Sequence, residues 1–408
     1  MPIHAPNAGM TPVVRVSFRS RRLLTLCLLF LATLFSSAVA SAAEPVAPLR
    51  IGISLGLSGE YAVPTAMMKN AYRLWQSDVN RRGGILGREV EVIIRDDKSD
   101  PATARRIYEE FILRDKLDFV FGPYSSTNTA VVAPLINQQG YPTLAPGSAS
   151  DQLWKQGYTN LFGIKQTGSR YALGFLALAA DAGIKRIAIV HTDNPFCKDM
   201  AFGAIKWAAE YDLQITFRGL LDKDSGNLDA LAAAARKSGA EALLIAGLFE
   251  EAVNMRRALK RINWTPVAYF ASVGPALDAY LNALGAEAQG AISFSSWEPR
   301  DDLGLPGSHA FAQAYRNAFG AVPGYHAAEA YASGQILDKA IQKAGSVDRA
   351  LVREELFRLD TVSIVGRFAV DRTGSQTKRD SLLTQWQSGR REIIWPAAVR
   401  TAAPLFNR

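Results

Sequence analysis

The sequence predicts an α/β fold made of two doubly wound lobes, each with a parallel sheet covered by helices on both faces. Short apolar segments alternate with amphipathic helical segments along nearly the whole chain. These strand-like segments are continuous apolar runs, which is typical of strands buried on both faces of a parallel sheet. The chain has 408 residues and is 48% hydrophobic, so it is long enough for two such lobes. Right-handed crossover connections between the parallel strands would give each lobe its doubly wound topology.

The first 42 residues have the pattern of a signal peptide. Four arginines between Arg15 and Arg22 precede the apolar run Leu23–Phe35. Small residues follow, and both Ala38-Val39-Ala40 and Ala40-Ser41-Ala42 fit the cleavage pattern, so cleavage after Ala40 and after Ala42 both stay open. The run is too short to span a membrane. The sequence therefore predicts that the protein is exported.

The charge and the cysteine content argue against a nucleic-acid-binding protein and against a protein stabilised by disulfides. The formal net charge is +8, and removing a leader with four arginines and no acids leaves +4 (8 − 4). This charge is spread along the chain without a basic cluster, so no nucleic-acid partner is expected. Only Cys197 remains after cleavage, so the core must be stable without an intrachain disulfide.

The first lobe is predicted to comprise residues 48–166 and 295–372. Its helices end or begin at recognisable signals, since Gly83-Gly84 ends the first and Ser99-Asp100-Pro101 begins the second. Helical patterns also dominate from His309 to Leu359. The expected strands are Leu49–Leu55, Val90–Ile94, Phe119–Phe121 and a short one from Tyr141, and the expected helices are Thr65–Asn80, Pro101–Arg114 and Thr127–Gln139.

The second lobe is predicted to comprise residues 167–294 and 373–408. No low-complexity linker separates the lobes, which indicates several short crossings and a hinged molecule. The expected strands are Arg186–His191, Leu213–Phe217, Ala242–Ala246, Pro266–Phe270, Ala291–Phe294, Leu382–Gln387 and Glu392–Trp395, and the expected helices are one beginning near Arg170, then Phe196–Glu210, Asn227–Lys237 and Glu250–Arg261.

One junction in the first lobe has the pattern of an anion site. The strand ending at Phe121 turns at Gly122-Pro123, and Tyr124, Ser125 and Ser126 follow just where a helix should begin. A helix N-terminus has unpaired N–H groups and the positive end of the backbone dipole. The serine hydroxyls would either contact a ligand or only cap the helix, and the residues alone leave both readings open.

Patterns of catalysis and of cofactor binding are missing from the sequence. The glycines of Gly52–Gly59 fit neither a dinucleotide nor a P-loop motif. The three histidines of the mature chain lack metal-ligand spacing. His191 and Cys197 form a weak Cys-His candidate, and no G-x-S-x-G elbow is present. We therefore expect no cofactor, no metal and no enzymatic activity.

Aromatic residues instead recur in loops that follow strands. Ligands of such sheets bind beyond the carboxyl ends of the strands, where two facing lobes would form one cleft. Taken singly, each of these residues is more typical of core packing than of a ligand wall. They are Tyr61, Tyr124, Trp154, Phe196, Phe249 and Trp297.

Several motifs in order resemble the periplasmic leucine/isoleucine/valine-binding proteins of ABC importers, which have the type I periplasmic-binding fold. The resemblance implies two lobes, three hinge crossings, ligand capture as the lobes close, and docking on the membrane permease subunits; we expect a monomer. The motifs are Ile51-Gly52 to Leu57-Ser58-Gly59, Val79–Gly87, Asp96–Pro101, Phe121–Ser126, Ala145–Ser150 and Gly366–Asp371 before Gly374.

The resemblance also implies site residues. By position, the residues that would bind the ligand carboxylate are Ser126 with its neighbours and the Ser148-Ala149 loop. The residues that would form aromatic walls are Phe196 and Phe249. Ala149 stands where the family commonly has threonine, which leaves Ser148 or Ser150 as substitute hydroxyls.

In the amino-acid binders of this family an acid pairs with the α-ammonium of the ligand, and the matching position in this sequence lies near Val273. Either Asp193, Glu250 or Glu251 replaces it, or the ligand has no α-ammonium, because a buried ammonium without a counter-charge costs several kcal/mol. Phenylalanine in place of tyrosine at two wall positions also removes polar groups. These departures favour a carboxylate with an apolar or aromatic body over a branched-chain amino acid.

The sequence therefore predicts an exported solute-binding protein that captures a small organic carboxylate, with branched-chain and other amino acids, aromatic acids and aliphatic acids all still open. The alternative is a sensor or regulator on the same fold that binds an amide, urea or a similar small molecule. The signal peptide and the lack of an appended DNA-binding module argue against a cytosolic regulator.

Overall fold

The structure is a computed structural model that describes residues 9–13, 46–222, 226–378 and 381–407. The chain divides into two units, Met1–Val46 and Ala47–Arg408. Residues 9–13 have no regular secondary structure, and the rest of the predicted signal peptide, including both cleavage positions, lies outside the described residues. Among the helices of the described ranges, none is long and apolar enough to cross a membrane.

The first lobe is built on parallel strands. In the described part of the chain, β1 pairs with β2 and β3 on either side, and β4 pairs with β5. The Gly122 N–H donates to the Leu144 carbonyl oxygen (2.9 Å) and so connects β3 to β4. The strands are β1 (Leu49–Leu55), β2 (Val90–Asp96), β3 (Phe119–Val120), β4 (Thr143–Ala145) and β5 (Leu161–Gly163), with the short pair β11 (Thr361–Ser363) and β12 (Gly366–Phe368).

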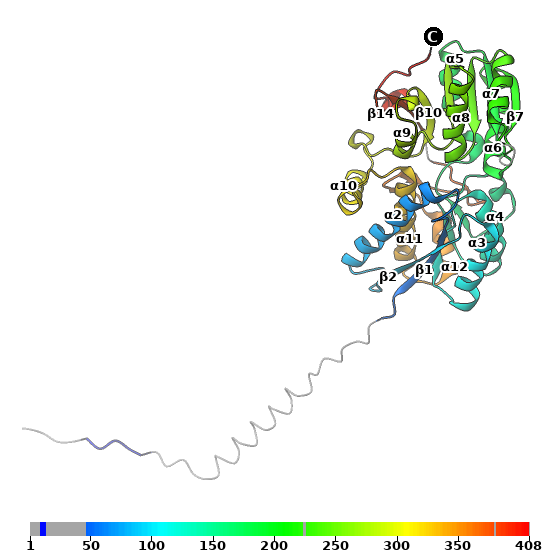
Figure 1. Cartoon of the computed structure of the whole chain (residues 1–408). Helices are drawn as coiled ribbons and strands as arrows, with labels where there is room; N and C mark the ends of the chain where they lie inside the picture. Colours follow the sequence, from blue (N-terminus) through cyan, green and yellow to red (C-terminus); the bar gives the residue numbers. More distant parts are fainter. Residues whose placement is uncertain (1–8, 14–45, 223–225, 379–380, 408) are drawn as a thin grey trace, which may run out of the picture. The chain divides into compact units, whose positions relative to one another are not determined.

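Helices flank this sheet in Figure 1. Helices α2 and α11 form one neighbouring pair, and α3 and α4 form another. The helices of the first lobe are α2 (Ala62–Arg81), α3 (Pro101–Glu109) continued by a π-helical turn (Glu110–Arg114), α4 (Ser126–Gln138), α10 (Ser308–Phe319), α11 (Tyr325–Ala344) and α12 (Arg349–Arg358).

The second lobe has a seven-stranded sheet of order β14-β13-β10-β9-β8-β6-β7 among the described residues. Strands β10 through β7 are parallel, whereas β13 and β14 form an antiparallel pair at one edge. The elements are α5 (Leu173–Asp181), β6 (Arg186–His191), α6 (Pro195–Glu210), β7 (Gln214–Leu220), α7 (Leu228–Lys237), β8 (Ala242–Ala246), α8 (Phe249–Arg261), β9 (Ala268–Ala271), α9 (Asp278–Leu284), β10 (Ala291–Ser295), β13 (Leu382–Gln387) and β14 (Arg390–Trp395).

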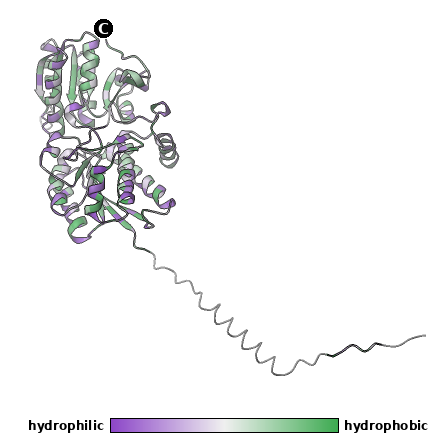
Figure 2. Cartoon of the chain, turned by 180° about the vertical axis from the view of Figure 1, so that it is seen from behind, coloured by the Kyte–Doolittle hydropathy of each residue, from purple (hydrophilic) through white to green (hydrophobic). Residues whose placement is uncertain are grey.

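Burial explains why these segments form strands and helices. Every residue of β8 is buried, as a strand covered on both faces requires. Helix α2 buries Met68, Tyr72, Trp75 and Val79 on one face. In Figure 2 the helices show hydrophilic and hydrophobic residues together, while the central strands are mainly hydrophobic. A Cβ at Gly334 of α11 would lie 2.2 Å from the Trp75 ring, so this glycine permits the close approach of α2 and α11.

Three features differ from the sequence analysis. Strand β5, which ends at Gly163 just before the predicted lobe boundary at residue 166, was not predicted. Helix α9 and the pair β11–β12 were not predicted. The lobe boundaries at residues 166, 294 and 372 remain a prediction, since Ala47–Arg408 forms one compact unit.

Three crossings connect the two lobes and contact one another. The Gly163 N–H donates to the Gly374 carbonyl oxygen (2.8 Å), which holds the crossing after β5 against the crossing before β13. The crossing after β5 and the crossing after β10 both bind Glu329 of α11, through Lys165 and Ser296 respectively. Two of the three crossings therefore meet at one buried carboxylate.

Candidate functional site

A cavity lies between the ends of the two sheets. Its empty volume is about 450 Å³, including its opening to solvent. Several lining residues follow the carboxyl ends of parallel strands: Tyr124 follows β3, Lys165 follows β5, Phe196 follows β6 and Val273 follows β9. This is where ligands bind to doubly wound sheets.

The N-terminus of α4 forms one wall of the cavity. The Ser125 Oγ accepts a hydrogen bond from the Asn128 N–H (3.1 Å) and so caps the helix. Ser125 itself has φ 82° and ψ 147°, a region that glycine favours, so its backbone is strained. Such strain often marks a functional site. Here it accompanies the turn that brings Ser126 and Thr127 to the cavity.

The hydroxyl of Ser126 is arranged as a donor. Its Oγ accepts from the backbone N–H groups of Ala149 (3.1 Å) and Ser150 (2.9 Å). A serine oxygen has two acceptor positions, so both are used and the hydroxyl proton is left to donate. A donor at a helix N-terminus suits a carboxylate, because the dipole and the hydrogen bond act in the same direction.

The loop after β4 approaches this turn through Gly147. A Cβ at this position would lie 2.7 Å from the Tyr124 Cα and 2.9 Å from the Pro123 carbonyl oxygen. Only glycine fits at such a distance. The sequence Gly122-Pro123 followed by Gly147-Ser148 therefore brings two strand-end loops into contact at the cavity.

A buried ion pair adjoins the cavity. The Lys165 Nζ lies 2.7 Å from the Glu329 Oε2, and the side chains are 4% and 0% exposed. The other carboxylate oxygen accepts from the Ser296 hydroxyl at 2.5 Å. Lys165 lines the cavity, and its charge is balanced by Glu329, which is not among the lining residues.

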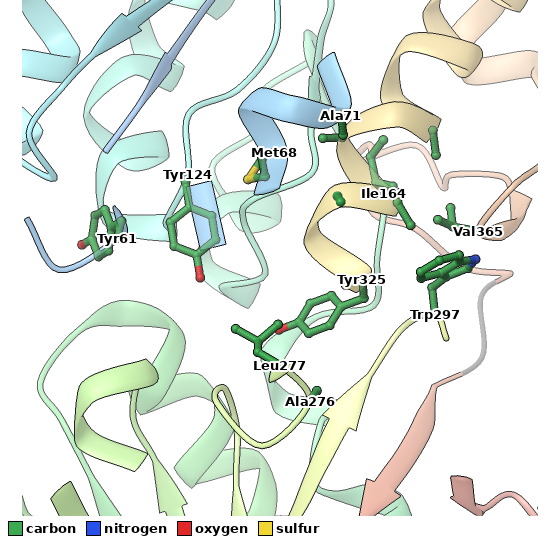
Figure 3. Packing of buried hydrophobic residues seen from close by; sticks show 14 of the residues in the cluster. Tyr61, Met68, Ala71, Tyr124, Ile164, Ala276, Leu277, Trp297, Tyr325 and Val365 are labelled. Atoms are coloured by element: carbon green, nitrogen blue, oxygen red, sulfur yellow. The ribbon is translucent and has the colours of Figure 1, made fainter. Parts of the chain in front are cut away.

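Aromatic rings surround much of the cavity. The Tyr61 and Tyr124 rings lie 5.4 Å apart, and both appear side by side in Figure 3. Tyr124 contacts His326 (5.4 Å between ring centroids), and His326 stacks on Tyr325 (3.9 Å). From the second lobe, Tyr171 and Phe196 contact each other at 5.1 Å. Flat apolar walls of this kind favour a flat or branched apolar ligand body.

Burial keeps the titratable groups of this wall neutral. Desolvation, and then the nearby Lys165 ammonium, lowers the pKa of His326 well below its usual value, so the imidazole is uncharged at pH 7. Desolvation likewise raises the pKa of Tyr124 and of Tyr325 above that of an ordinary phenol. The aromatic wall thus provides hydrogen-bonding groups without net charge.

Seven of the residues proposed from the sequence line the cavity. Their contact with a ligand remains a prediction. They are Tyr61, Tyr124, Ser125, Ser126, Ala149, Phe196 and Val273.

The structure places the other four proposed residues elsewhere. Ser148 is buried behind the loop, where its Oγ bonds with the Thr129 hydroxyl. Ser150 lines a neighbouring pocket. Trp297 is fully buried and its Nε1 donates to the Ser308 Oγ (2.9 Å), and Phe249 packs in the same hydrophobic core. The sequence indicated that these residues follow strands, but only packing decides which way their side chains point.

The three acids suggested as a counter-charge for an ammonium also lie outside the cavity lining. Asp193 is exposed and pairs with Lys198 (3.0 Å). Glu250 is exposed, and Glu251 accepts from the Leu248 N–H (2.8 Å) at the start of α8. Among the described residues that line the cavity, none is Asp or Glu.

Sequence reasoning missed eight lining residues: Thr127, Gly147, Lys165, Tyr171, Asn194, Leu248, Tyr325 and His326. Tyr325 and His326 begin α11 directly after Pro323-Gly324, and this start of a helix was the signal that could have identified them. Lys165 lies in the segment predicted to cross between the lobes, where a buried lysine needs a partner that sequence alone does not reveal.

Comparison with known proteins agrees with this fold. The family model described as periplasmic binding protein matches residues 48–391. The Leu/Ile/Val-binding protein homolog 1 of Brucella melitensis biotype 1 is 23% identical over 370 residues, covering 88% of this chain and 96% of that protein. The chain belongs to the periplasmic binding protein family, and specifically resembles its leucine/isoleucine/valine-binding members.

Two solved structures are similar in fold. A leucine binding protein from Thermotoga maritima has a TM-score of 0.78 at 19% identity and covers 85% of this chain and 97% of its own. The solute binding protein of an ABC transporter from R. palustris, solved in complex with benzoate, has a TM-score of 0.75 at 18% identity and covers 87% and 98%. Both comparisons support the type I periplasmic-binding fold of this chain.

Proposed function

We propose that this protein is the periplasmic solute-binding component of an ABC importer, and that it captures a small carboxylate with an aromatic or branched apolar body and no α-ammonium group. The carboxylate would lie at the N-terminus of α4, with the Ser126 hydroxyl as a donor. The rings of both lobes would enclose the body. The protein would then deliver the ligand to a membrane permease.

The observation that carries this proposal is the charge of the cavity lining. The position near Val273 has no acid, and the described lining residues include no carboxylate that would pair with an ammonium. Lys165 brings a positive charge to the wall, balanced by Glu329. An amino acid would bury an unpaired ammonium here, whereas a simple carboxylate meets a helix N-terminus and a donor hydroxyl.

The relatives are compatible with either ligand class. A fold like this one holds benzoate in the R. palustris protein, and the T. maritima protein is named for leucine. The choice for this chain therefore depends on its own residues, and these favour the carboxylate without an ammonium.

Calorimetry with matched ligand pairs tests the proposal. Leucine and 4-methylpentanoate differ only by the α-ammonium, and phenylalanine and 3-phenylpropanoate form the aromatic pair. We expect each carboxylate to bind at least about a hundredfold more tightly than its amino acid, because an unpaired buried ammonium costs several kcal/mol. Benzoate paired with benzamide isolates the carboxylate charge.

Two outcomes would contradict the proposal. Tighter binding of leucine or phenylalanine would show that the cavity accommodates an ammonium. Binding of benzamide or urea in preference to every carboxylate would instead support the sensor of amides that the sequence left as the alternative.

A further inference from the structure

Tyr124 and His326 form a polar pair in the cavity wall. The Tyr124 hydroxyl oxygen lies 3.4 Å from the His326 Nε2, and the two residues are 5% and 2% exposed. The His326 Nδ1 is buried and has no hydrogen-bond partner within the described parts of the chain. Figure 3 shows that the Tyr124 hydroxyl points away from its own strand-end loop, toward the loops of the second lobe. A buried nitrogen without a partner is costly and indicates a missing hydrogen-bonding group.

Two neighbouring polar residues of the cavity, Asn194 and Lys165, already make hydrogen bonds within the protein. The Asn194 Oδ1 accepts from the Cys197 N–H (2.9 Å), and its amide nitrogen donates to the Thr192 Oγ1 (3.0 Å). Lys165 donates to Glu329. These side chains are held by the protein, so they are poor candidates for completing the hydrogen bonds of the Tyr124–His326 pair.

The pair leaves one donor and one acceptor whichever nitrogen of the neutral imidazole carries the proton. If Tyr124 donates to Nε2, the proton is on Nδ1, and the Nδ1–H is the remaining donor while the phenol oxygen accepts. If instead Nε2–H donates to Tyr124, then Nδ1 accepts and the phenol O–H donates. A hydroxyl group can donate and accept, so it satisfies the pair in both tautomers.

We propose that the ligand is a hydroxy-substituted aromatic carboxylate, whose ring hydroxyl binds the Tyr124–His326 pair while its carboxylate lies at the N-terminus of α4. This inference rests on the proposed function and adds the specificity determinant for the ligand body. The rings of Tyr61, Tyr124 and Tyr325 around the pair supply the flat walls for an aromatic ring. His326 and Tyr124 are thus specificity residues.

Calorimetry with benzoate, the three hydroxybenzoates and the three methylbenzoates tests the inference on the full mature chain. A methyl group fills the place of the hydroxyl without hydrogen bonding. We expect at least one hydroxybenzoate to bind about tenfold or more tightly than both benzoate and its methyl counterpart, because leaving buried polar groups unpaired is penalised. Equal affinity of all seven acids would overturn the inference and leave the proposed function standing.

Substitution of His326 tests whether the preference for the hydroxybenzoate depends on the Tyr124–His326 pair. In His326→Phe, which keeps a ring beside Tyr325, the preference for the hydroxybenzoate over its methyl counterpart should fall to about twofold or less. His309→Phe is the matched control, because His309 is exposed and pairs with Asp301 (2.6 Å) away from the cavity lining, and the preference should persist there.

If His326→Phe does not fold by circular dichroism, Tyr124→Phe gives the same test through the other partner. An undiminished preference in the folded variant would overturn the assignment. Failure of every aromatic acid to bind the natural chain would refute the proposed aromatic ligand itself.

Discussion

At the scale of single residues, the proposed anion site depends on Ser126. Its oxygen accepts from two backbone N–H groups, so its proton is the group left to donate toward the cavity. Ser148 is a neighbouring buried serine that the sequence also suggested, yet its hydroxyl bonds with Thr129 and with the Ser125 carbonyl oxygen. We therefore propose a role in binding for Ser126 and a role in packing for Ser148.

Ser126→Ala should weaken the binding of a carboxylate by about 1–3 kcal/mol, the cost typical of a lost hydrogen bond to a charged group. The substitution also leaves the Ala149 and Ser150 N–H groups unpaired, so the melting temperature of the free protein should fall as well. Titration calorimetry with benzoate or 4-methylpentanoate measures the first effect, and thermal unfolding without ligand measures the second.

Ser148→Ala is the matched control for this substitution. It should lower the melting temperature while the dissociation constant stays within about twofold of the natural value, since Ser148 is not a lining residue. Unchanged affinity in Ser126→Ala would remove Ser126 from the anion site.

At the scale of elements, Glu329 of α11 connects the crossings to the cavity. Its carboxylate binds Lys165 and Ser296, which lie on two different crossings between the lobes. The pair is almost fully buried, so removing one partner leaves the other charge uncompensated. Helix α11 also provides Tyr325 and His326, so one helix N-terminus contributes both to the cavity wall and to the hinge.

Glu329→Gln should destabilise the folded state by about 3–5 kcal/mol, the range for breaking a buried ion pair. In Lys165→Met combined with Glu329→Gln, the loss should be clearly smaller than the sum of the two single losses, because no buried charge remains unpaired. Urea unfolding of the four proteins gives the coupling energy. Strict additivity would show that the two groups do not interact in solution.

At the scale of the whole molecule, contacts in the neighbouring pocket indicate how the lobes are held together. Asp199 of α6 in the second lobe accepts hydrogen bonds from the Ser150 hydroxyl and from the Gln152 amide nitrogen (3.3 Å) of the first lobe. The Ser150 N–H in turn donates to Ser126. The Ser126 hydroxyl, at the proposed anion site, is therefore one hydrogen bond from Ser150 and two hydrogen bonds from Asp199.

Asp199→Ala should raise the dissociation rate of the ligand about fivefold, because the contact forms only when the lobes meet and is worth about 1 kcal/mol. The association rate and the melting temperature of the free protein should change little. Stopped-flow fluorescence with benzoate or 4-methylpentanoate separates the two rates.

Lys198→Ala tests the neighbouring charge as a control, since Lys198 pairs with Asp193 inside the second lobe. A slower association with an unchanged dissociation rate in Asp199→Ala would argue against a closing contact.

The sequence by itself determined the fold class, most element positions and the junction before α4. Apolar runs separated by amphipathic segments admit few other architectures, and Gly122-Pro123 followed by serines marks the start of a helix whatever surrounds it. For the same reason the sequence located the strand-end loops that line the cavity, including Tyr124, Ser126 and Phe196.

Only the tertiary structure decided which of these side chains face the cavity. Trp297 and Phe249 follow strands as Phe196 does, but they pack into the core, because neighbouring helices fill the space around them. The pairing of Lys165 with Glu329 and the approach of His326 to Tyr124 join residues that are 164 and 202 positions apart. Local pattern carries no information about contacts of this range, and these contacts set the charge and the hydrogen bonds offered to the ligand.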